Sequence, residues 1–489
     1  MSDATWVHVS LYFQGLFLGY FLLINAAYLS LNYISLYALV GYMRGHRAEY
    51  LPKSLRSYQP PVSILIPAFN ERETIVSSVS SLFNLNYPQF EIVIINDGST
   101  DGMVEEVMRA FQMVEFPEAY RQRIATRPVT RVFASARFPQ VRLVDKENGG
   151  KADALNAGIN CARYPIICTM DADCILQQDS LHRVVRPFLE DPKTVAVGGV
   201  VRVLNGCTVR DGMLEKVELP RKLLPLFQLV EYLRAFLFGR LGWSPLNALM
   251  VISGAFGVFY KERMIAVGGY RTDTVGEDMD IVVRLHLNLR KEGRPYRITF
   301  VPDPICWTEV PADLRSLRNQ RMRWQRGLAE SVGPHLNFIG AHRSGTVGWL
   351  ALPFMLVFEL IGPLIEVFGY AATIILWALG LIPLASFLVF LFVSIGVGML
   401  LSINALFLEE LSFHLYPKFR QQFRLAFAAL LENFGYRQIN SVWRAWAMIK
   451  WLVPFTRQKQ WGKIERVGEW QRPELGAAVP RDPKNPSPP

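Results

Sequence analysis

Residues 164–173 read Tyr-Pro-Ile-Ile-Cys-Thr-Met-Asp-Ala-Asp, an apolar run that ends in two carboxylates. This pattern is typical of a short buried strand with polar groups at its carboxyl end. Residues 62–67 and 90–95 form two similar apolar runs, and residues 71–83 between them have helical spacing. Strands that alternate with helices predict an α/β domain with a mostly parallel sheet, in which ligands bind at the carboxyl ends of the strands.

Apolar segments flank this domain on both sides. The chain has 489 residues, 51% of them hydrophobic, and the stretches at 11–43 and 346–408 are apolar. Both are long enough to cross a bilayer as helices, which takes about 20 residues per span. Pro363 and Pro383 divide the second stretch into two or three spans. Basic residues at 44–56 follow the first stretch, and because cytosolic flanks are rich in Lys and Arg, we expect a multi-pass inner-membrane protein with a cytosolic central domain.

The predicted organisation has five parts. They are an N-terminal transmembrane helix with its cytosolic flank at 1–58, the α/β domain at 59–310, interface helices at 311–345, a transmembrane or interface region at 346–455, and a cytosolic, partly disordered tail at 456–489.

Two segments mix charged side chains with Leu and Phe. They are residues 221–250, inside the predicted α/β domain, and residues 314–328. This composition favours amphipathic helices that lie on a membrane surface. Ordinary helices packed on the protein core are the alternative.

The net charge of +10 comes from 52 Lys and Arg against 42 Asp and Glu. Because the arginines lie beside apolar segments, we interpret them as charges at a membrane surface and expect no nucleic-acid partner. The five cysteines lie in the central domain without CxxC or zinc spacing, so we expect reduced thiols.

Carboxylates lie at the carboxyl ends of two of the predicted strands. Asp171 and Asp173 follow the strand at 164–170, and alternate residues of an extended segment share a face. Both can therefore point toward one metal-bound diphosphate. Asp97 ends the strand at 90–95 within Asn-Asp-Gly-Ser. A surface turn is the alternative for either pattern, and a helix cap is a further alternative for the second.

Three further elements carry charge. Residues 146–151 (KENGGK) place two lysines around a glycine pair, which suits a phosphate or a solvated loop. Asp278, in the acidic cluster 276–280, is a candidate general base, and a helix cap is the alternative. Residues 320–324 (QRMRW) combine cations for a diphosphate with an indole that can stack on a sugar; a membrane-surface helix is the other interpretation.

Taken in order, these elements resemble the family 2 glycosyltransferases, whose GT-A fold is a Rossmann-like α/β architecture. The resemblance is to the membrane-integrated processive synthases of cellulose, chitin, hyaluronan and poly-N-acetylglucosamine. The motifs that carry it are PAFNE at 67–71, NDGS at 96–99, KENGGK at 146–151, DAD at 171–173, GED at 276–278 and QRMRW at 320–324. Gly276 stands where the cellulose synthases have Thr.

The resemblance implies inverting transfer of a sugar from a UDP-sugar to a growing β-linked glycan, with Mg²⁺ or Mn²⁺ as cofactor. It also implies a lipid bilayer, export of the glycan through the membrane region, and export or accessory subunits as partners. Asp278 would be the base, supported by Glu277, and Asp173 would ligate the metal. The nucleotide-sugar would contact Asn70, Glu71, Asp97, Lys151, Asp171, Gln320 and Arg323. The acceptor would contact Trp324, Ser253 and Gly254.

Two other functions stay open at this point. One is a non-processive enzyme that adds a single sugar to a lipid acceptor. The other is an inactive homologue that serves as a scaffold subunit. Product length separates the first from a processive synthase, and release of UDP separates the second from any enzyme.

Overall fold

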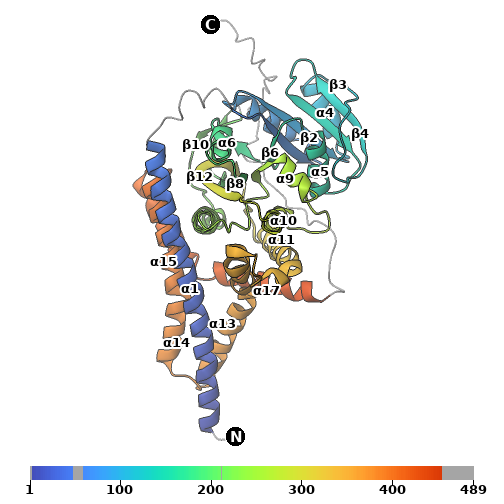
Figure 1. Ribbon diagram of the computed structural model, residues 1–489. Coiled ribbons are helices and arrows are strands. Elements are labelled where there is room, and N and C mark those ends of the chain that lie inside the picture. Colours follow the sequence, from blue (N-terminus) through green and yellow to red (C-terminus); the bar gives the residue numbers. More distant parts are fainter. Residues whose placement is uncertain (1–2, 48–58, 211, 454–489) are drawn as a thin grey trace. The chain divides into compact units, whose positions relative to one another are not determined.

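The computed structural model describes residues 3–47, 59–210 and 212–453, and the chain divides into two compact units (Figure 1). Of the described residues, a sheet unit holds 45–47, 59–218 and 249–310, and a helical unit holds 3–44, 219–248 and 311–453. The predicted tail at 456–489 lies outside the described residues.

A ten-stranded sheet forms the centre of the sheet unit, in the order β3-β4-β5-β2-β1-β6-β11-β8-β12-β7. Its strands are β1 (Val62–Ala68), β2 (Phe90–Asp97), β3 (Met113–Glu115), β4 (Val129–Ser135), β5 (Val141–Lys146), β6 (Ile166–Met170), β7 (Ile175–Leu176), β8 (Thr194–Val203), β11 (Phe256–Tyr260) and β12 (Arg297–Thr308). A separate two-stranded sheet joins β9 (Thr208–Arg210) to β10 (Met213–Lys216).

Parallel pairing dominates the middle of the large sheet. The strands β5, β2, β1 and β6 pair in parallel, as do β8 and β12, whereas β11 is antiparallel to both of its neighbours. The central strands are rich in Val and Ile and are buried on both faces, as expected for parallel strands covered by helices. The predicted α/β fold with a mostly parallel sheet is confirmed, and the polar ends of β2 and β6 lie on two strands that flank β1.

Seven helical segments accompany this sheet among the described residues. They are α3 (Ile75–Ser81), the 3-10 helix η1 (Leu82–Asn84), α4 (Met103–Ala110), α5 (Lys151–Cys161), α6 (Ser180–Glu190), α9 (Lys261–Ala266) and α10 (Glu277–Lys291). The helix predicted from residue 71 begins at Ile75 instead, because residues 71–74 form a turn in which Thr74 N donates to Glu71 O.

The helical unit is built from long apolar helices and shorter helices that pack on them. They are α1 (Asp3–Arg47), α7 (Leu223–Glu231), η2 (Tyr232–Gly239), α8 (Arg240–Trp243), α11 (Leu314–Val332), η3 (Gly333–Phe338), η4 (Val347–Ala351), α12 (Leu352–Phe354), η5 (Met355–Leu360), α13 (Gly362–Ala378), α14 (Leu384–Leu391), η6 (Phe392–Gly396), α15 (Val397–Ser412), α16 (Phe419–Leu431) and α17 (Tyr436–Leu452).

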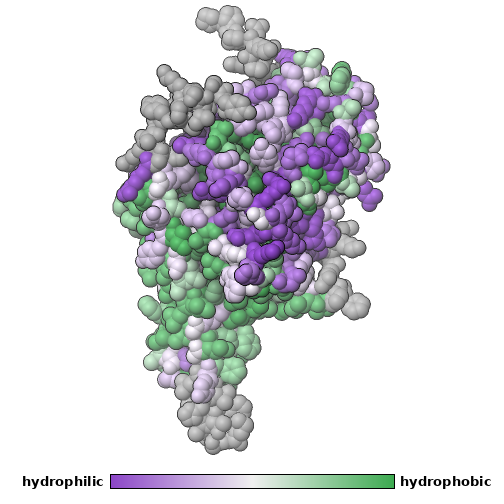
Figure 2. All heavy atoms as spheres, in the orientation of Figure 1, coloured by the Kyte–Doolittle hydropathy of each residue, from purple (hydrophilic) through white to green (hydrophobic). Residues whose placement is uncertain are grey.

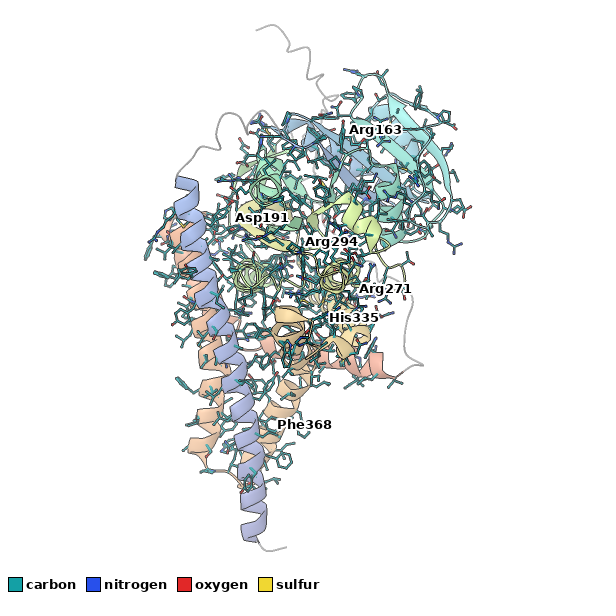
Figure 3. All side chains as sticks on the ribbon, in the orientation of Figure 1. Arg163, Asp191, Arg271, Arg294, His335 and Phe368 are labelled. Carbon is teal, nitrogen blue, oxygen red and sulfur yellow. The ribbon has the colours of Figure 1, made fainter. Side chains whose placement is uncertain are left out.

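Two of these helical segments, Tyr12–Arg44 and Leu384–Ser412, are long and apolar enough to cross a membrane. Val347–Leu360 and Gly362–Ala378 form a third span if this pair, bent by 41°, is counted as one. Figure 2 shows hydrophobic surface over α1, α13 and α14. The helices α1 and α13 are in contact: the ring centroid of Phe368 on α13 (Figure 3) lies 5.7 Å from that of Phe17 on α1. The composition of these helices indicates a membrane protein.

The two segments predicted as interface helices have few exposed apolar side chains. Leu226, Leu229, Leu233 and Phe238 are buried in α7 and η2, and α11 buries much of its length in the same unit. Residues 219–248 cluster with the helical unit rather than with the sheet. Exposed apolar side chains occur instead along α16 and α17.

Candidate active site

Lys151 connects acidic groups that are far apart in the sequence. It is the first residue of α5, and its Nζ lies 2.6 Å from Asp171 Oδ1 and 3.6 Å from Glu277 Oε1. Asp171 follows β6, whereas Glu277 is the first residue of α10. The ammonium also donates to the Gly254 carbonyl oxygen at 3.0 Å. One cation therefore joins the end of β6, the start of α10 and the loop before β11.

The Lys151 side chain is 18% exposed and stays protonated near neutral pH. Burial lowers the pKa of its ammonium, but the carboxylates of Asp171 and Glu277 raise that pKa by more than burial lowers it. The net shift of the pKa is therefore upward. A fixed cation between carboxylates holds their like charges close together. The same cation would attract a diphosphate brought to this edge of the sheet.

Asp278 lies beside the loop before β11. A Cβ atom added to Gly254 would be only 3.2 Å from Asp278 Oδ2, so a glycine leaves room for the carboxylate. Asp278 Oδ1 accepts a hydrogen bond from Met279 N at 2.9 Å, and Ser253 Oγ accepts one from Ala255 N at 3.3 Å. The structure brings together the residues predicted as base and as acceptor loop. Their roles remain predictions.

Asp173, the predicted metal ligand, is 4% exposed, and its Oδ2 accepts a hydrogen bond from Thr308 Oγ1 at 3.2 Å. No group of three His, Cys, Asp or Glu side chains among the described residues is arranged to hold a metal ion. Carboxylate oxygens are nevertheless the ligands that Mg²⁺ prefers, and Mg²⁺ is commonly held by one or two carboxylates together with substrate phosphates. Asp173 fits an ion that takes its remaining ligands from a diphosphate, whereas Asp171 is paired with Lys151.

Asp97, the last residue of β2, is 3% exposed and is held by the loop before α5. Its Oδ1 accepts hydrogen bonds from Lys146 Nζ at 2.7 Å and Gly149 N at 2.9 Å, and its Oδ2 accepts one from Gly150 N at 2.7 Å. Gly150 has φ +90°, a backbone conformation that favours glycine. The carboxylate therefore fixes the glycine pair, and its predicted contact with the nucleotide stays a prediction.

Asn70 links the loops that follow β1 and β2. Its backbone N–H donates to Ser99 Oγ at 2.9 Å, and its side-chain Oδ1 accepts from Thr100 N at 2.8 Å. Glu71 accepts a hydrogen bond from Thr74 Oγ1 at 2.6 Å in the turn that precedes α3. Both residues lie at the carboxyl edge of the parallel strands, where the sequence predicts the ligand site.

The QRMRW element lies on α11 in the helical unit. Arg321 is buried and donates to Glu231 Oε2 at 2.7 Å, and its guanidinium carbon lies 4.4 Å from the Trp324 ring centroid. Arg321 therefore anchors the helix within its unit. Gln320, Arg323 and Trp324, the three residues predicted to bind ligands, are each half-buried on the same helix.

Sequence reasoning gave Lys146 to a phosphate-binding or solvated loop and did not show that it is buried between Asp97 and Asp153 in the sheet unit. Lys146 is fully buried, and its Nζ lies 2.7 Å from Asp97 Oδ1 and 2.6 Å from Asp153 Oδ2. A lysine is almost never fully buried unless it is paired. Lys146 is the last residue of the apolar strand β5, and this position was the available signal for a buried ion pair. The sequence position of Asp153 gave no such signal, because its contact with Lys146 depends on how α5 packs against β1 and β2.

Comparison with known families agrees with this architecture. Residues 63–236 match the family "Glycosyl transferase family 2", and residues 166–400 match "Glycosyl transferase family group 2". The two matches together span most of both units. The chain belongs to the family 2 glycosyltransferases, and the predicted enzyme class is confirmed.

Among curated proteins the chain is similar to poly-β-1,6-N-acetyl-D-glucosamine synthases. It is 33% identical over 268 residues to that of Staphylococcus aureus (strain COL), which covers 54% of each chain. It is 30% identical over 310 residues to that of Staphylococcus epidermidis, covering 63% of this chain and 64% of the relative. The chain thus matches between about half and two thirds of the length of these relatives.

Solved structures give a weaker likeness. A mannosyltransferase from Pyrobaculum calidifontis, in complex with GDP-Man and Mn²⁺, is 20% identical with a TM-score of 0.49, over 86% of this chain and 99% of that one. Residues 1–349 of TarS from S. aureus are 12% identical with a TM-score of 0.38, over 77% of this chain and 91% of that one. The fold class therefore rests on the sheet order and the family match.

Proposed function

We propose that this protein is a processive synthase that transfers sugar from a UDP-sugar to a growing β-linked glycan. The observation that carries the proposal is the bridge made by Lys151, which gathers Asp171, Glu277 and the Asp278 loop at one edge of the sheet. Similarity to poly-β-1,6-N-acetyl-D-glucosamine synthases supports UDP-N-acetylglucosamine as the first donor to test.

In the proposed reaction the acceptor hydroxyl oxygen attacks the anomeric carbon of the donor. Asp278 takes the hydroxyl proton, a new C–O bond forms, and the bond between the anomeric carbon and the diphosphate oxygen breaks. UDP leaves with the bonding electron pair. A single in-line displacement inverts the configuration, so an α-linked donor gives a β-linkage.

The remaining site residues would bind and orient the substrates. Lys151 would neutralise charge on the diphosphate, and Asp97 would hold the loop 149–150 that faces the nucleotide. Gln320, Arg323 and Trp324 would serve the donor diphosphate and the terminal acceptor sugar. Asp173 would hold Mg²⁺ or Mn²⁺, which supplies positive charge to stabilise the leaving diphosphate, and Asp171 would contact the nucleotide.

The proposed setting is a membrane, with the sheet unit in the cytosol, where nucleotide sugars are available. Basic residues after α1 support this orientation. The growing glycan would be exported through the helical unit, with accessory subunits as candidate partners. The apolar spans of α1, α14 and α15 support a membrane location.

Donor turnover by purified protein in lipid nanodiscs tests the proposal. UDP-N-acetylglucosamine, UDP-glucose and UDP-glucuronate are each supplied with Mg²⁺ or Mn²⁺, and both UDP release and product size are measured. We expect UDP release with one donor, loss of release with EDTA, and a high-molecular-weight β-glycan. A product of one added sugar would indicate the non-processive enzyme, and no release with any donor would favour the scaffold.

A further inference from the structure

Two consecutive helices at the end of the described chain each expose a row of apolar side chains. On α16 and just after it these are Phe419, Phe423, Phe427, Leu430 and Phe434, with exposed fractions from 39% to 80%. On α17 they are Ile439, Val442, Trp446, Ile449 and Leu452, with exposed fractions from 43% to 55%. The spacing of three or four residues places each set on one helical face. Contiguous apolar surface of this kind marks an interaction site.

The opposite face of α17 is turned into the protein and carries hydrogen-bonding polar side chains beside the buried Ala445 and Met448. Tyr436 Oη donates to Glu231 Oε2 at 2.7 Å, Ser441 Oγ donates to Glu366 Oε2 at 2.6 Å, and Arg444 Nε donates to Gln325 Oε1 at 2.7 Å. A helix on a water-facing surface has the reverse arrangement, with its apolar side inward. The inverted order of α17 therefore predicts an apolar environment outside this helix.

The charges on this surface have one sign. Between residues 416 and 453 the sole acidic residue is Glu432, which is buried and paired with Arg234. Lys418, Arg420 and Lys450 are exposed, and Lys450 Nζ lies 5.5 Å from the Trp446 ring centroid. Basic side chains that flank an apolar stripe complement the headgroups of an anionic leaflet.

Neither helix is a membrane span. The helices α16 and α17 have 13 and 17 residues, and neither is among the helices long and apolar enough to cross a bilayer. We propose that α16 and α17 lie in the interface of an anionic lipid leaflet, with their exposed apolar stripe among the acyl chains and their basic side chains at the headgroups. This inference does not depend on the proposed catalytic function.

Spin labels on single cysteines measure the environment of the stripe directly. The background replaces the partly accessible Cys207 with Ser, because the other four cysteines are buried. Labels are placed by Phe427→Cys and Trp446→Cys, and a matched control by Val114→Cys, an exposed apolar residue (63%) of β3. The full-length protein is reconstituted in nanodiscs of phosphatidylcholine and phosphatidylglycerol at a ratio of about 7:3, a mixture that supplies anionic headgroups.

We expect labels at 427 and 446 to be relaxed by oxygen and protected from a water-soluble nickel chelate, with the reverse order at 114. Access of the nickel chelate to 427 and 446 would overturn the proposal, because the stripe would then face water. Protection from both reagents would also overturn it, because the stripe would then be covered by protein, whether a second copy or another subunit.

Lipid preference tests the basic side chains separately. Energy transfer from a fluorophore at 427 to labelled phosphatidylglycerol should exceed that to labelled phosphatidylcholine by about fivefold or more, since each basic residue near an anionic surface contributes about that factor. The variant K418Q/R420Q/K450Q should lose this preference, and high salt should weaken it. Equal transfer to both lipids in the unmodified protein would remove the anionic part of the proposal.

Discussion

The two units use buried charge in different ways. In the sheet unit, Lys151 and Asp171 pair at an edge where 18% and 24% of the two side chains are exposed, so a ligand can reach the pair. In the helical unit, Arg321 is 3% exposed and pairs with Glu231, which holds α11 against its neighbours. Charges near the strand ends are therefore candidates for catalysis, whereas the buried pair of Arg321 and Glu231 fixes where the α11 side chains lie.

Replacement of the buried lysine in the sheet unit should have the largest effect on stability. Lys146→Met leaves the carboxylates of Asp97 and Asp153 buried without their cation, and removal of one partner from a buried pair costs about 3–5 kcal/mol. Thermal unfolding of the detergent-solubilised protein measures the loss. Lys193→Met, at an exposed position, is the matched control and should stay within about 0.5 kcal/mol of the parent. Equal unfolding free energies for the two variants would show that the ion pairs of Lys146 contribute nothing to stability.

Acid should weaken the sheet unit through His286. Burial lowers the pKa of this fully buried imidazole to about 4, and its Nδ1 and Nε2 lie 2.8 Å and 2.9 Å from Tyr296 Oη and Leu249 O. Below about pH 6.5 the unfolded chain binds a proton at this site that the folded chain does not. Stability should therefore fall by about 3 kcal/mol between pH 6.5 and pH 4 and then level off.

Unfolding of the parent and of His286→Gln across this pH range isolates that contribution. The variant is expected to start less stable, because it loses the shape of the imidazole, but to decline less steeply toward pH 4. Parallel declines in the two proteins would assign the acid sensitivity to other groups.

Glu231→Gln tests the anchoring role of charge in the helical unit. The neutral amide keeps the shape of the side chain but removes the charge opposite Arg321, and we expect a loss of about 2 kcal/mol. Product length should shorten because Trp324 sits against Arg321, whereas UDP release by hydrolysis of the donor should change little. Glu215→Gln, at an exposed site on β10, is the control. If Glu231→Gln instead loses donor hydrolysis but keeps product length, the anchoring role assigned to this pair in the helical unit is wrong.

The smallest stability effect is expected at the glycine beside the candidate base. Gly254→Ala places a methyl group 3.2 Å from Asp278 Oδ2, which should shift the carboxylate slightly and reduce turnover by about tenfold. The unfolding free energy should change by about 1 kcal/mol or less. Gly41→Ala on α1, where an added Cβ meets no atom within 4 Å, should leave turnover unchanged. Full activity in Gly254→Ala would separate this loop from the reaction.

The sequence predicted the parts of this architecture that local patterns encode. Apolar runs located β1, β2 and β6, because parallel strands buried on both faces are nearly continuous in Val and Ile. The motifs that contain Asp97, Asp171 and Asp278 were identified from residue type and position. Long apolar stretches likewise predicted α1 and the helices between residues 346 and 412.

Contacts between distant segments were not predictable in the same way. The spacing of Asp97, Lys146 and Asp153 does not reveal that Lys146 pairs with both aspartates, because this depends on the register of β5 beside β2 and on the packing of α5. Nor does the composition of residues 221–250 distinguish a membrane-surface helix from one packed inside a helical unit. Apolar and charged residues alternate in both, and the packing partners decide which face is covered.

The central claim is that Asp278 is the base of a glycosyltransferase site in the sheet unit, and Asp278→Asn tests it most directly. With the donor that supports UDP release, we expect turnover to fall by about 10²–10⁴-fold, the usual contribution of a general base, while donor affinity stays within about twofold. Asp179→Asn, a partly exposed aspartate on the same unit, serves as the matched control. UDP release that persists in Asp278→Asn at the rate of the control would contradict the assignment.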